Sequence, residues 1–405
     1  MNNEAMNNEQ LVALYVHVPF CRARCAYCDF NTYAGLDDLI PAYVAAVCRE
    51  IEAAGRRWGR LTVPTVYFGG GTPSLLPLDL LADILHVLRV TCCVLRDAEI
   101  TIEANPGTVT PAYLRGLCEL GINRLSLGAQ SAHEDELRLL GRIHTWEQAA
   151  ETVHWAREAG FTNLNLDLIF GLPEQSLARW QETLEAALAL EPEHLSLYSL
   201  TVEEDTPLAR RIAAGDLPAP DEDLAAEMYE MAEVRLAQAG FEHYEISNWA
   251  KKNLRIGEST KQRNNESAGQ RPGFQCRHNL AYWRNEPWLG LGAGAHSWMG
   301  GKRWANVRHP REYIAALEAD RSPVAEVEEI DRRTEMGETM MLGLRLTEGV
   351  SDARFRARFG VGLERAFGGE LVELCDLGLL EWNGDVARLT ARGRLLGNQV
   401  FERFL

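Results

Sequence analysis

Three cysteines near the start of the chain, Cys21, Cys25 and Cys28, lie within eight residues of one another. They follow an apolar run that ends in Pro19-Phe20. Thiolates are the usual ligands of iron–sulfur clusters. Three of them can hold three irons of a [4Fe–4S] cluster and leave the fourth iron open to a small molecule. The spacing therefore predicts a cluster with one open coordination position.

Two other interpretations of these cysteines stay open. Spacings of four and three place side chains on one face of a helix, where buried cysteines behave as small apolar residues. Zinc also binds thiolates, although its sites usually combine a C-x2-C pair with two further ligands. The run from Leu11 to Val18 is typical of a strand, and Pro19 ends it. We therefore expect the cysteines on a loop, which favours the cluster.

Polar and glycine-rich segments follow later apolar runs. Residues 68–74, Phe-Gly-Gly-Gly-Thr-Pro-Ser, let the backbone approach a ligand closely, but they lack the Gly-Lys-Ser/Thr ending of a phosphate loop. A tight turn is the alternative.

Glu103 can bond a ribose hydroxyl or an amine, or cap a helix. Gln130 offers an amide, and Arg142 a fixed cation for a carboxylate. Asp167 stands among apolar residues, where a buried carboxylate needs a partner.

The composition excludes several classes of protein. The 405 residues carry a formal net charge of −17, which argues against a nucleic-acid partner. The nine cysteines are an odd number and suit a reducing compartment better than a disulfide framework. The sequence has neither an apolar run of about 18 residues nor a charged-then-apolar leader. We therefore expect a cytoplasmic protein.

Short apolar runs alternate with amphipathic stretches over residues 11–201. Six repeats of strand then helix predict an α/β fold in which a parallel sheet curls into a partial (β/α)6-type barrel. Catalytic groups gather at the C-terminal ends of such strands, where the polar segments above also fall. The expected strands are 11–18, 65–68, 99–103, 124–127, 163–169 and 194–200. The expected helices are 41–56, 78–90, 111–120, 145–159, 177–190, 221–240, 332–342, 351–359 and 363–377.

The rest of the chain divides into further regions. Residues 1–10 are expected to be a disordered tail. Residues 202–323 form an accessory region of one helix and irregular segments. Within it, the polar stretch 251–274 is typical of a flexible surface insertion, with an ordered basic interaction loop as the alternative. Residues 324–405 combine helices with an Asn-Gly hairpin, which predicts a winged-helix-like module. Its acidic residues favour a structural or lid role over DNA binding.

The cysteine loop, with Tyr27 before its last cysteine, resembles the cluster motif of the radical S-adenosylmethionine (SAM) superfamily. In that superfamily the open iron binds SAM, and reductive cleavage of SAM gives a 5′-deoxyadenosyl radical. The resemblance implies that Cys21, Cys25 and Cys28 hold the cluster. The residues that it implies in SAM binding are Tyr15, Tyr27, Gly70, Gly71, Thr72, Glu103, Gln130, Arg142 and Asp167.

Within this superfamily, residues 12–405 resemble the coproporphyrinogen III oxidase-like branch. The branch contains an oxygen-independent oxidase, which decarboxylates coproporphyrinogen III to protoporphyrinogen IX, and heme chaperones. The oxidase carries a fourth cysteine where this chain has Phe30, and a long extension before its cluster motif. Only about 20 residues precede Cys21 here. Both differences point away from the oxidase.

Residues 276–283, Cys-Arg-His-Asn-Leu-Ala-Tyr-Trp, match an H-N-x-x-Y-W element linked with heme binding in the chaperones. A histidine can bind iron, and aromatic rings can stack on a porphyrin face. The implied heme residues are His278, Asn279, Tyr282 and Trp283. A core segment with a satisfied histidine is the alternative. The insertion at 251–274 departs from the family pattern directly before this element.

The resemblance thus implies a heme chaperone that binds a [4Fe–4S] cluster, SAM and heme and passes heme to an acceptor protein. It also implies an electron donor for the cluster and transient contact with membrane heme proteins. Two alternatives remain: the oxygen-independent oxidase of porphyrin biosynthesis, and a regulator that binds DNA through its C-terminal module. No residue is assigned a catalytic role.

Overall fold

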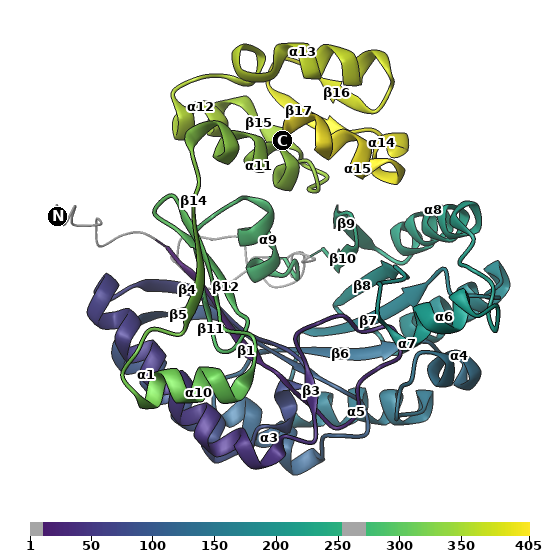
Figure 1. The fold of residues 1–405 in the computed structure, drawn as a ribbon. Coiled ribbons are helices and arrows are strands. Elements are labelled where there is room, and N and C mark those ends of the chain that lie inside the picture. Colours follow the sequence, from purple (N-terminus) through teal and green to yellow (C-terminus); the bar gives the residue numbers. More distant parts are fainter. Residues whose placement is uncertain (1–10, 253–272) are drawn as a thin grey trace, which may run out of the picture.

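One sheet of 12 strands organises the chain in a computed structural model, which describes residues 11–252 and 273–405. Its strand order is β14-β13-β12-β11-β1-β4-β5-β6-β7-β8-β10-β9 (Figure 1). The tail expected at 1–10 and most of the insertion expected at 251–274 lie outside the described residues. Among the described helices, none is long and apolar enough to cross a membrane.

The middle of the sheet is a run of parallel strands in sequence order, which confirms the predicted barrel-like α/β fold. Helices cover the outer face of the curved sheet (Figure 1). The strands are β1 (Ala13–Val18), β4 (Thr62–Gly70), β5 (Cys93–Ala104), β6 (Arg124–Gln130), β7 (Leu164–Phe170) and β8 (His194–Ser199). The helices are α1 (Ile40–Trp58), α2 (Leu78–Thr91), α3 (Pro111–Glu119), α5 (Trp146–Ala159) and α6 (Leu177–Ala189).

Burial on both faces explains why these segments form strands. Every residue of β6 is buried, and in β7 only Asp167 is partly exposed. Strands of parallel sheets are covered on both sides, so they tolerate few solvated side chains. The helices bury one face each. In α1 this face contains Tyr43, Val47 and Ile51, which are spaced four residues apart.

Apart from β14, the strands at both edges of the sheet come from the region that the sequence indicated as irregular, and that expectation was wrong for these segments. The strand β14 lies in the segment that was expected to belong to the C-terminal module. On one edge β11 pairs parallel with β1, followed by antiparallel β12 to β14; on the other, β10 and β9 continue antiparallel from β8. The strands are too short to show a periodic pattern, and pairing with neighbours orders them. They are β9 (Phe241–Glu245), β10 (Asn248–Lys251), β11 (Trp288–Leu291), β12 (His296–Met299), β13 (Lys302–Asn306) and β14 (Val324–Glu329).

Several helices connect or flank these strands. The predicted helix at 221–240 is confirmed as α8 (Glu222–Gln238). The others, which have six to nine residues, were not predicted. They are α4 (Glu134–Leu139), α7 (Pro207–Ala213), α9 (Arg277–Trp283) and α10 (Pro310–Glu318).

The C-terminal module has its own apolar core, which includes Phe355, Phe367 and Phe404. Its small sheet has the order β15-β17-β16, and the predicted helices and hairpin are confirmed. Figure 1 shows the module above the large sheet, with α14 and α15 toward α8. Its elements are α11 (Arg332–Gly343), β15 (Val350–Ser351), α12 (Asp352–Phe359), α13 (Leu363–Asp376), β16 (Leu380–Trp382), β17 (Val386–Leu389), α14 (Ala391–Leu395) and α15 (Gly397–Phe401).

Candidate functional site

The three cysteines lie on a folded loop, as the sequence predicted. The loop leaves β1, forms the short strand β2 (Phe20–Cys21) and closes where β2 pairs with β3 (Tyr33–Ala34). Cys21 is buried, whereas Cys25 and Cys28 are partly exposed, and all three are free thiols. The helical alternative is therefore excluded for these residues.

The glycine-rich segment after β4 lies directly against Cys21. The Gly71 amide donates to the Val18 carbonyl at 2.8 Å, and the Thr72 hydroxyl donates to the Cys21 sulfur at 3.8 Å. A Cβ atom on Gly71 would lie 2.6 Å from the Phe20 carbonyl oxygen and 2.9 Å from the Cys21 sulfur. This close approach of two backbones explains why glycine stands there.

Arg142 connects the cysteine loop to two strand ends. Its Nη1 donates to the Cys25 sulfur at 3.4 Å, and its Nη2 donates to the Gly128 carbonyl at 2.8 Å and to Asn105. Asn105 in turn donates to the Thr72 hydroxyl at 2.8 Å. A continuous hydrogen-bonded chain therefore runs from Cys25 through Arg142, Asn105 and Thr72 to Cys21.

The donor set fits an iron–sulfur cluster. Burial raises the pKa of the Cys21 thiol, with the Thr72 hydroxyl opposing the rise, and burial also raises the pKa of Cys28. Bound iron stabilises the thiolate form, so ligation would reverse this effect. Within the described residues, no three His, Cys, Asp or Glu side chains converge to hold a single metal ion. Three free thiols on one loop match the chemistry that clusters require.

Glu103 and Asp167 lie on the inner face of the curved sheet. Glu103 accepts hydrogen bonds from the Tyr67 hydroxyl at 2.8 Å and from the Gly70 amide at 3.1 Å. Burial, and then the Asp167 carboxylate, raises the pKa of Glu103 to about 7. Burial also raises the pKa of Asp167, which accepts from Ser126 at 3.1 Å and from Asn165 at 2.9 Å. Both carboxyls thus have the partners that their burial demands.

Gln130, at the end of β6, has an unsatisfied acceptor. Its side chain is buried, and its carbonyl oxygen has no hydrogen-bond partner among the described residues. Its backbone φ is +67°, and the ladder to β7 is irregular between Gly128 and Gln130. Such strain and an unpaired buried oxygen are typical of a ligand contact. The side chain therefore fits a donor group of SAM.

The two implied tyrosines also lie beside this site. The Tyr15 hydroxyl is 3.0 Å from His17 Nδ1, and its ring stacks on Tyr67 with centroids 6.2 Å apart. Burial raises the pKa of the Tyr27 hydroxyl, which lies near Arg142 and Cys25. The structure thus brings together the cysteines, the glycine segment and the strand-end residues.

The proposed heme element is placed differently. His278, on α9, is 2% exposed, and burial lowers its pKa to about 3. Its Nδ1 lies 2.9 Å from the Thr65 hydroxyl and its Nε2 lies 3.1 Å from the Tyr282 hydroxyl. Thr65 precedes Gly70 by five residues on β4, so His278 lies toward the other end of that strand from the cysteines. In this conformation both ring nitrogens have partners.

The other members of that element also make internal contacts. Asn279 donates to the buried Glu245 carboxylate at 3.1 Å. Trp283 carries the Arg345 guanidinium over its ring, 5.1 Å from the centroid. The element therefore joins the inner face of the sheet to the C-terminal module.

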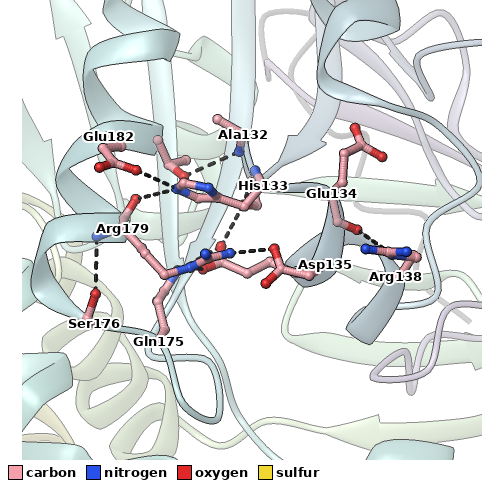
Figure 2. A network of polar contacts seen from close by, with 12 residues as sticks. Ala132, His133, Glu134, Asp135, Arg138, Gln175, Ser176, Arg179 and Glu182 are labelled. Atoms are coloured by element: carbon pink, nitrogen blue, oxygen red, sulfur yellow. Dashed lines mark hydrogen bonds and ion pairs between the residues drawn. The ribbon is translucent and has the colours of Figure 1, made fainter.

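Sequence reasoning missed the polar network that anchors α4. Glu136 is 5% exposed and accepts from Ser131, from Gln175 at 3.1 Å and from Arg179 at 2.9 Å. Figure 2 shows Gln175 and Arg179 reaching across to α4. The chain after α4 passes Leu140, whose carbonyl accepts the Ala26 amide at 2.9 Å, and continues to Arg142. A buried glutamate in a short acidic helix leaves no distinctive sequence signal.

Comparisons with known proteins agree with this geometry. Residues 15–187 match the radical SAM superfamily, and residues 330–396 match the HemN C-terminal domain. Heme chaperone HemW of Mycobacterium tuberculosis is 41% identical over 98% of this chain and 95% of its own length. The Bacillus subtilis protein of the same name is 36% identical over 96% and 98%.

A solved structure of coproporphyrinogen III oxidase (HemN) from Escherichia coli shares the fold. It has a TM-score of 0.82 at 23% identity and covers 98% of this chain and 91% of its own. The radical SAM match assigns a [4Fe–4S] cluster and SAM as cofactors, as the sequence predicted. From its similarity to relatives along nearly its whole length, the chain belongs to the heme chaperone HemW family of radical SAM proteins.

Proposed function

We propose that this protein is a heme chaperone, which binds heme and passes it to an acceptor protein while carrying a [4Fe–4S] cluster and SAM. The observation that carries the proposal is identity of 34–41% to proteins named heme chaperone HemW over nearly the full chain. Phe30 supports the proposal, because it stands at the position where the oxidase carries an extra cysteine. Its side chain is 63% exposed. A reduced electron donor and a cytoplasmic location belong to the same proposal.

In this proposal Cys21, Cys25 and Cys28 ligate three irons. When bound, the cluster supplies one-electron chemistry toward SAM. The chain's own residues position SAM beside it. The proposed contacts are Tyr15, Tyr27, Gly70, Gly71, Thr72, Glu103, Gln130, Arg142 and Asp167.

The proposed heme residues remain His278, Asn279, Tyr282 and Trp283. For His278 to bind iron, its Nε2 must exchange the Tyr282 hydroxyl, 3.1 Å away, for the metal. This exchange requires the Tyr282 hydroxyl to move away from Nε2. Because burial lowers the pKa of His278, its imidazole ring is neutral. The neutral ring is the form that ligates iron.

Protein reconstituted with iron and sulfide under anaerobic conditions tests the proposal. We expect about four irons per chain with cluster absorption in the wild type, loss of both in Cys25→Ala, and retention in the matched Cys375→Ala. Hemin titration should give stoichiometric binding, followed by transfer to an added apo-hemoprotein.

Conversion of coproporphyrinogen III to protoporphyrinogen IX with consumption of SAM would contradict the proposal and establish the oxidase. Absence of hemin binding to the wild type would also contradict it.

A further inference from the structure

Asn31 connects the end of the cysteine loop to a distant part of the chain. Its side-chain amide donates to the Ala293 carbonyl at 3.1 Å and to the Arg308 carbonyl at 2.9 Å. Its Oδ1 accepts a hydrogen bond from the Tyr33 hydroxyl at 3.1 Å. An asparagine amide offers two N–H donors and one oxygen acceptor, so the donors and the acceptor are all used. We call these three contacts the Asn31 clasp.

The turn at 292–295, which receives the clasp, is itself firmly held. Ala293 is fully buried, and its amide donates to the Tyr43 hydroxyl at 2.9 Å. The amide of Gly292 donates to the Glu50 carboxylate at 2.8 Å. Tyr43 and Glu50 both belong to α1, so this turn is fixed to a long helix. The clasp therefore ties the cysteine loop to a fixed point of the fold.

Gly294 leaves the space that the Asn31 side chain occupies. Its backbone φ is +73°, a conformation that residues with a side chain rarely adopt. A Cβ atom at this position would overlap Nδ2 of Asn31. A side chain at position 294 and the clasp therefore exclude each other.

The two halves of the cysteine loop are held by different parts of the molecule. Arg142 holds the half that contains Cys25. The clasp holds the half that contains Cys28, which lies close to Asn31 along the chain. The Cys28 sulfur is 4.0 Å from the Thr32 hydroxyl, and Thr32 directly follows Asn31. The position of Cys28 relative to Cys25 therefore depends on the clasp.

Asn31 also connects the cysteine loop to the proposed SAM site through His17. Nε2 of His17 lies 2.9 Å from the backbone carbonyl of Asn31, and Nδ1 lies 3.0 Å from the Tyr15 hydroxyl. Burial lowers the pKa of His17, so its ring is neutral. Because a carbonyl only accepts, Nε2 carries the hydrogen and Nδ1 accepts from the Tyr15 hydroxyl. A displacement of Asn31 therefore disturbs the hydroxyl of a proposed SAM contact.

We propose that Asn31 is a positioning residue, which fixes Cys28 for cluster binding and, through His17, the Tyr15 hydroxyl for SAM binding. This inference rests on the cluster and SAM part of the proposed function. Groups that orient the ligands of a metal centre typically change its metal affinity by about 10–100-fold when they are replaced. The clasp has this role toward the cluster, and the contact with His17 extends it to SAM.

Two variants break the clasp from opposite sides. Asn31→Asp keeps the shape of the side chain but replaces its N–H donors by an oxygen that repels the two carbonyls. Gly294→Ala leaves the cysteine loop unchanged and fills the space of the Asn31 amide. One matched control is Asn398→Asp, at an exposed position on α15. The other is Gly300→Ala, where φ is +62° but, within the described part of the chain, only adjacent residues lie within 4 Å of the added Cβ.

Iron release and SAM binding are measured on full-length protein reconstituted under anaerobic conditions. We expect both clasp variants to lose iron to EDTA at least about tenfold faster than the wild type. Equilibrium dialysis should show SAM binding weakened by about tenfold in both variants, whereas both controls should match the wild type. Urea unfolding of the cofactor-free proteins shows separately how much the clasp contributes to folding.

The outcomes separate the positioning role from the proposed function. If the wild type holds about four irons and both clasp variants retain iron and bind SAM equally well, the positioning role is wrong and the proposed function stands. A lower unfolding free energy with normal iron release and SAM binding would make the clasp a folding contact only. Faster iron release with unchanged SAM binding would overturn the connection through His17. If the wild type binds no cluster, the proposed function fails and the positioning role fails with it.

Discussion

At the scale of single residues, the inner face of the sheet is built from buried polar groups that satisfy one another. Burial raises the pKa of Glu103 and of Asp167 and lowers the pKa of His278. All three shifts favour the neutral form of the side chain, because a buried charge costs more than a buried, hydrogen-bonded neutral group. The same burial makes the stability of the cofactor-free protein depend on pH.

Glu103 provides a prediction for this dependence. Its folded pKa of about 7 is above that of the unfolded chain. Between roughly pH 4.5 and 7 the folded state keeps a proton that the unfolded state releases, so this contribution to stability is present below that window and is lost as pH rises through it. Glu103→Gln should therefore lessen the fall in urea-unfolding free energy from pH 5 to 7.5.

Two comparisons check the assignment. The exposed Glu151 gives the control Glu151→Gln, which should keep the wild-type slope. Glu50 is a second buried carboxyl whose pKa burial raises to about 7, so some slope should persist in Glu103→Gln. An unaltered slope in Glu103→Gln would show that the carboxyl is ionised in the folded protein.

At the scale of elements, short segments hold the cluster loop in place. The turn after α4 supplies both the Leu140 carbonyl that accepts the Ala26 amide and the Arg142 guanidinium that reaches Cys25. The α4 helix has six residues and little intrinsic stability. Its position depends on the Glu136 network with α6 and the loop before it.

Glu136→Gln should disturb the cluster loop from a distance. The change weakens the contacts of Glu136 with Arg179 and Ser131, and we expect a loss of about 1–3 kcal/mol in unfolding free energy. Iron content after reconstitution should fall, because Arg142 is no longer fixed against Cys25. Glu119→Gln is the control, since that side chain is exposed on α3, outside the network. Normal iron content in a destabilised Glu136→Gln would confine the network to a folding role.

At the scale of the whole molecule, the C-terminal module docks through a few polar contacts. Thr347 donates through its amide to the Tyr244 carbonyl at 3.0 Å, and Ile246 donates to the Arg345 carbonyl at 3.2 Å. Arg394 on α14 pairs with Glu233 on α8, which also lies 3.1 Å from His243.

Glu233→Gln should loosen this docking. The change weakens a charged hydrogen bond and should lower the free energy of local opening by about 1 kcal/mol. Amide exchange in α14 and α15 should therefore become about fivefold faster. Exchange in α2, far from the module in sequence and in contact with α1 and α3, should stay unchanged. The exposed neighbour Glu230→Gln serves as the control. Equal exchange in both variants would mean that the pair does not hold the module.

The sequence predicted those parts of the fold that depend on local patterns. Runs such as 124–127 and 163–169 were recognisable because a strand buried on both faces must be apolar, and α1 was recognisable from its periodic apolar face. The edge strands β9 to β13 were missed. They are four or five residues long, and their stability comes from pairing with β1 and β8, which local sequence does not reveal.

For the site, the sequence alone determined the cysteine spacing and the order of the strand-end residues, because both are fixed along the chain. Only the tertiary structure decided which groups meet. It joined Cys25 to Cys21 through Arg142, Asn105 and Thr72, and it buried His278 between Thr65 and Tyr282. Except for His278 and Tyr282, which are four residues apart on α9, these contacts join residues that are tens to hundreds of positions apart, so packing alone determines them.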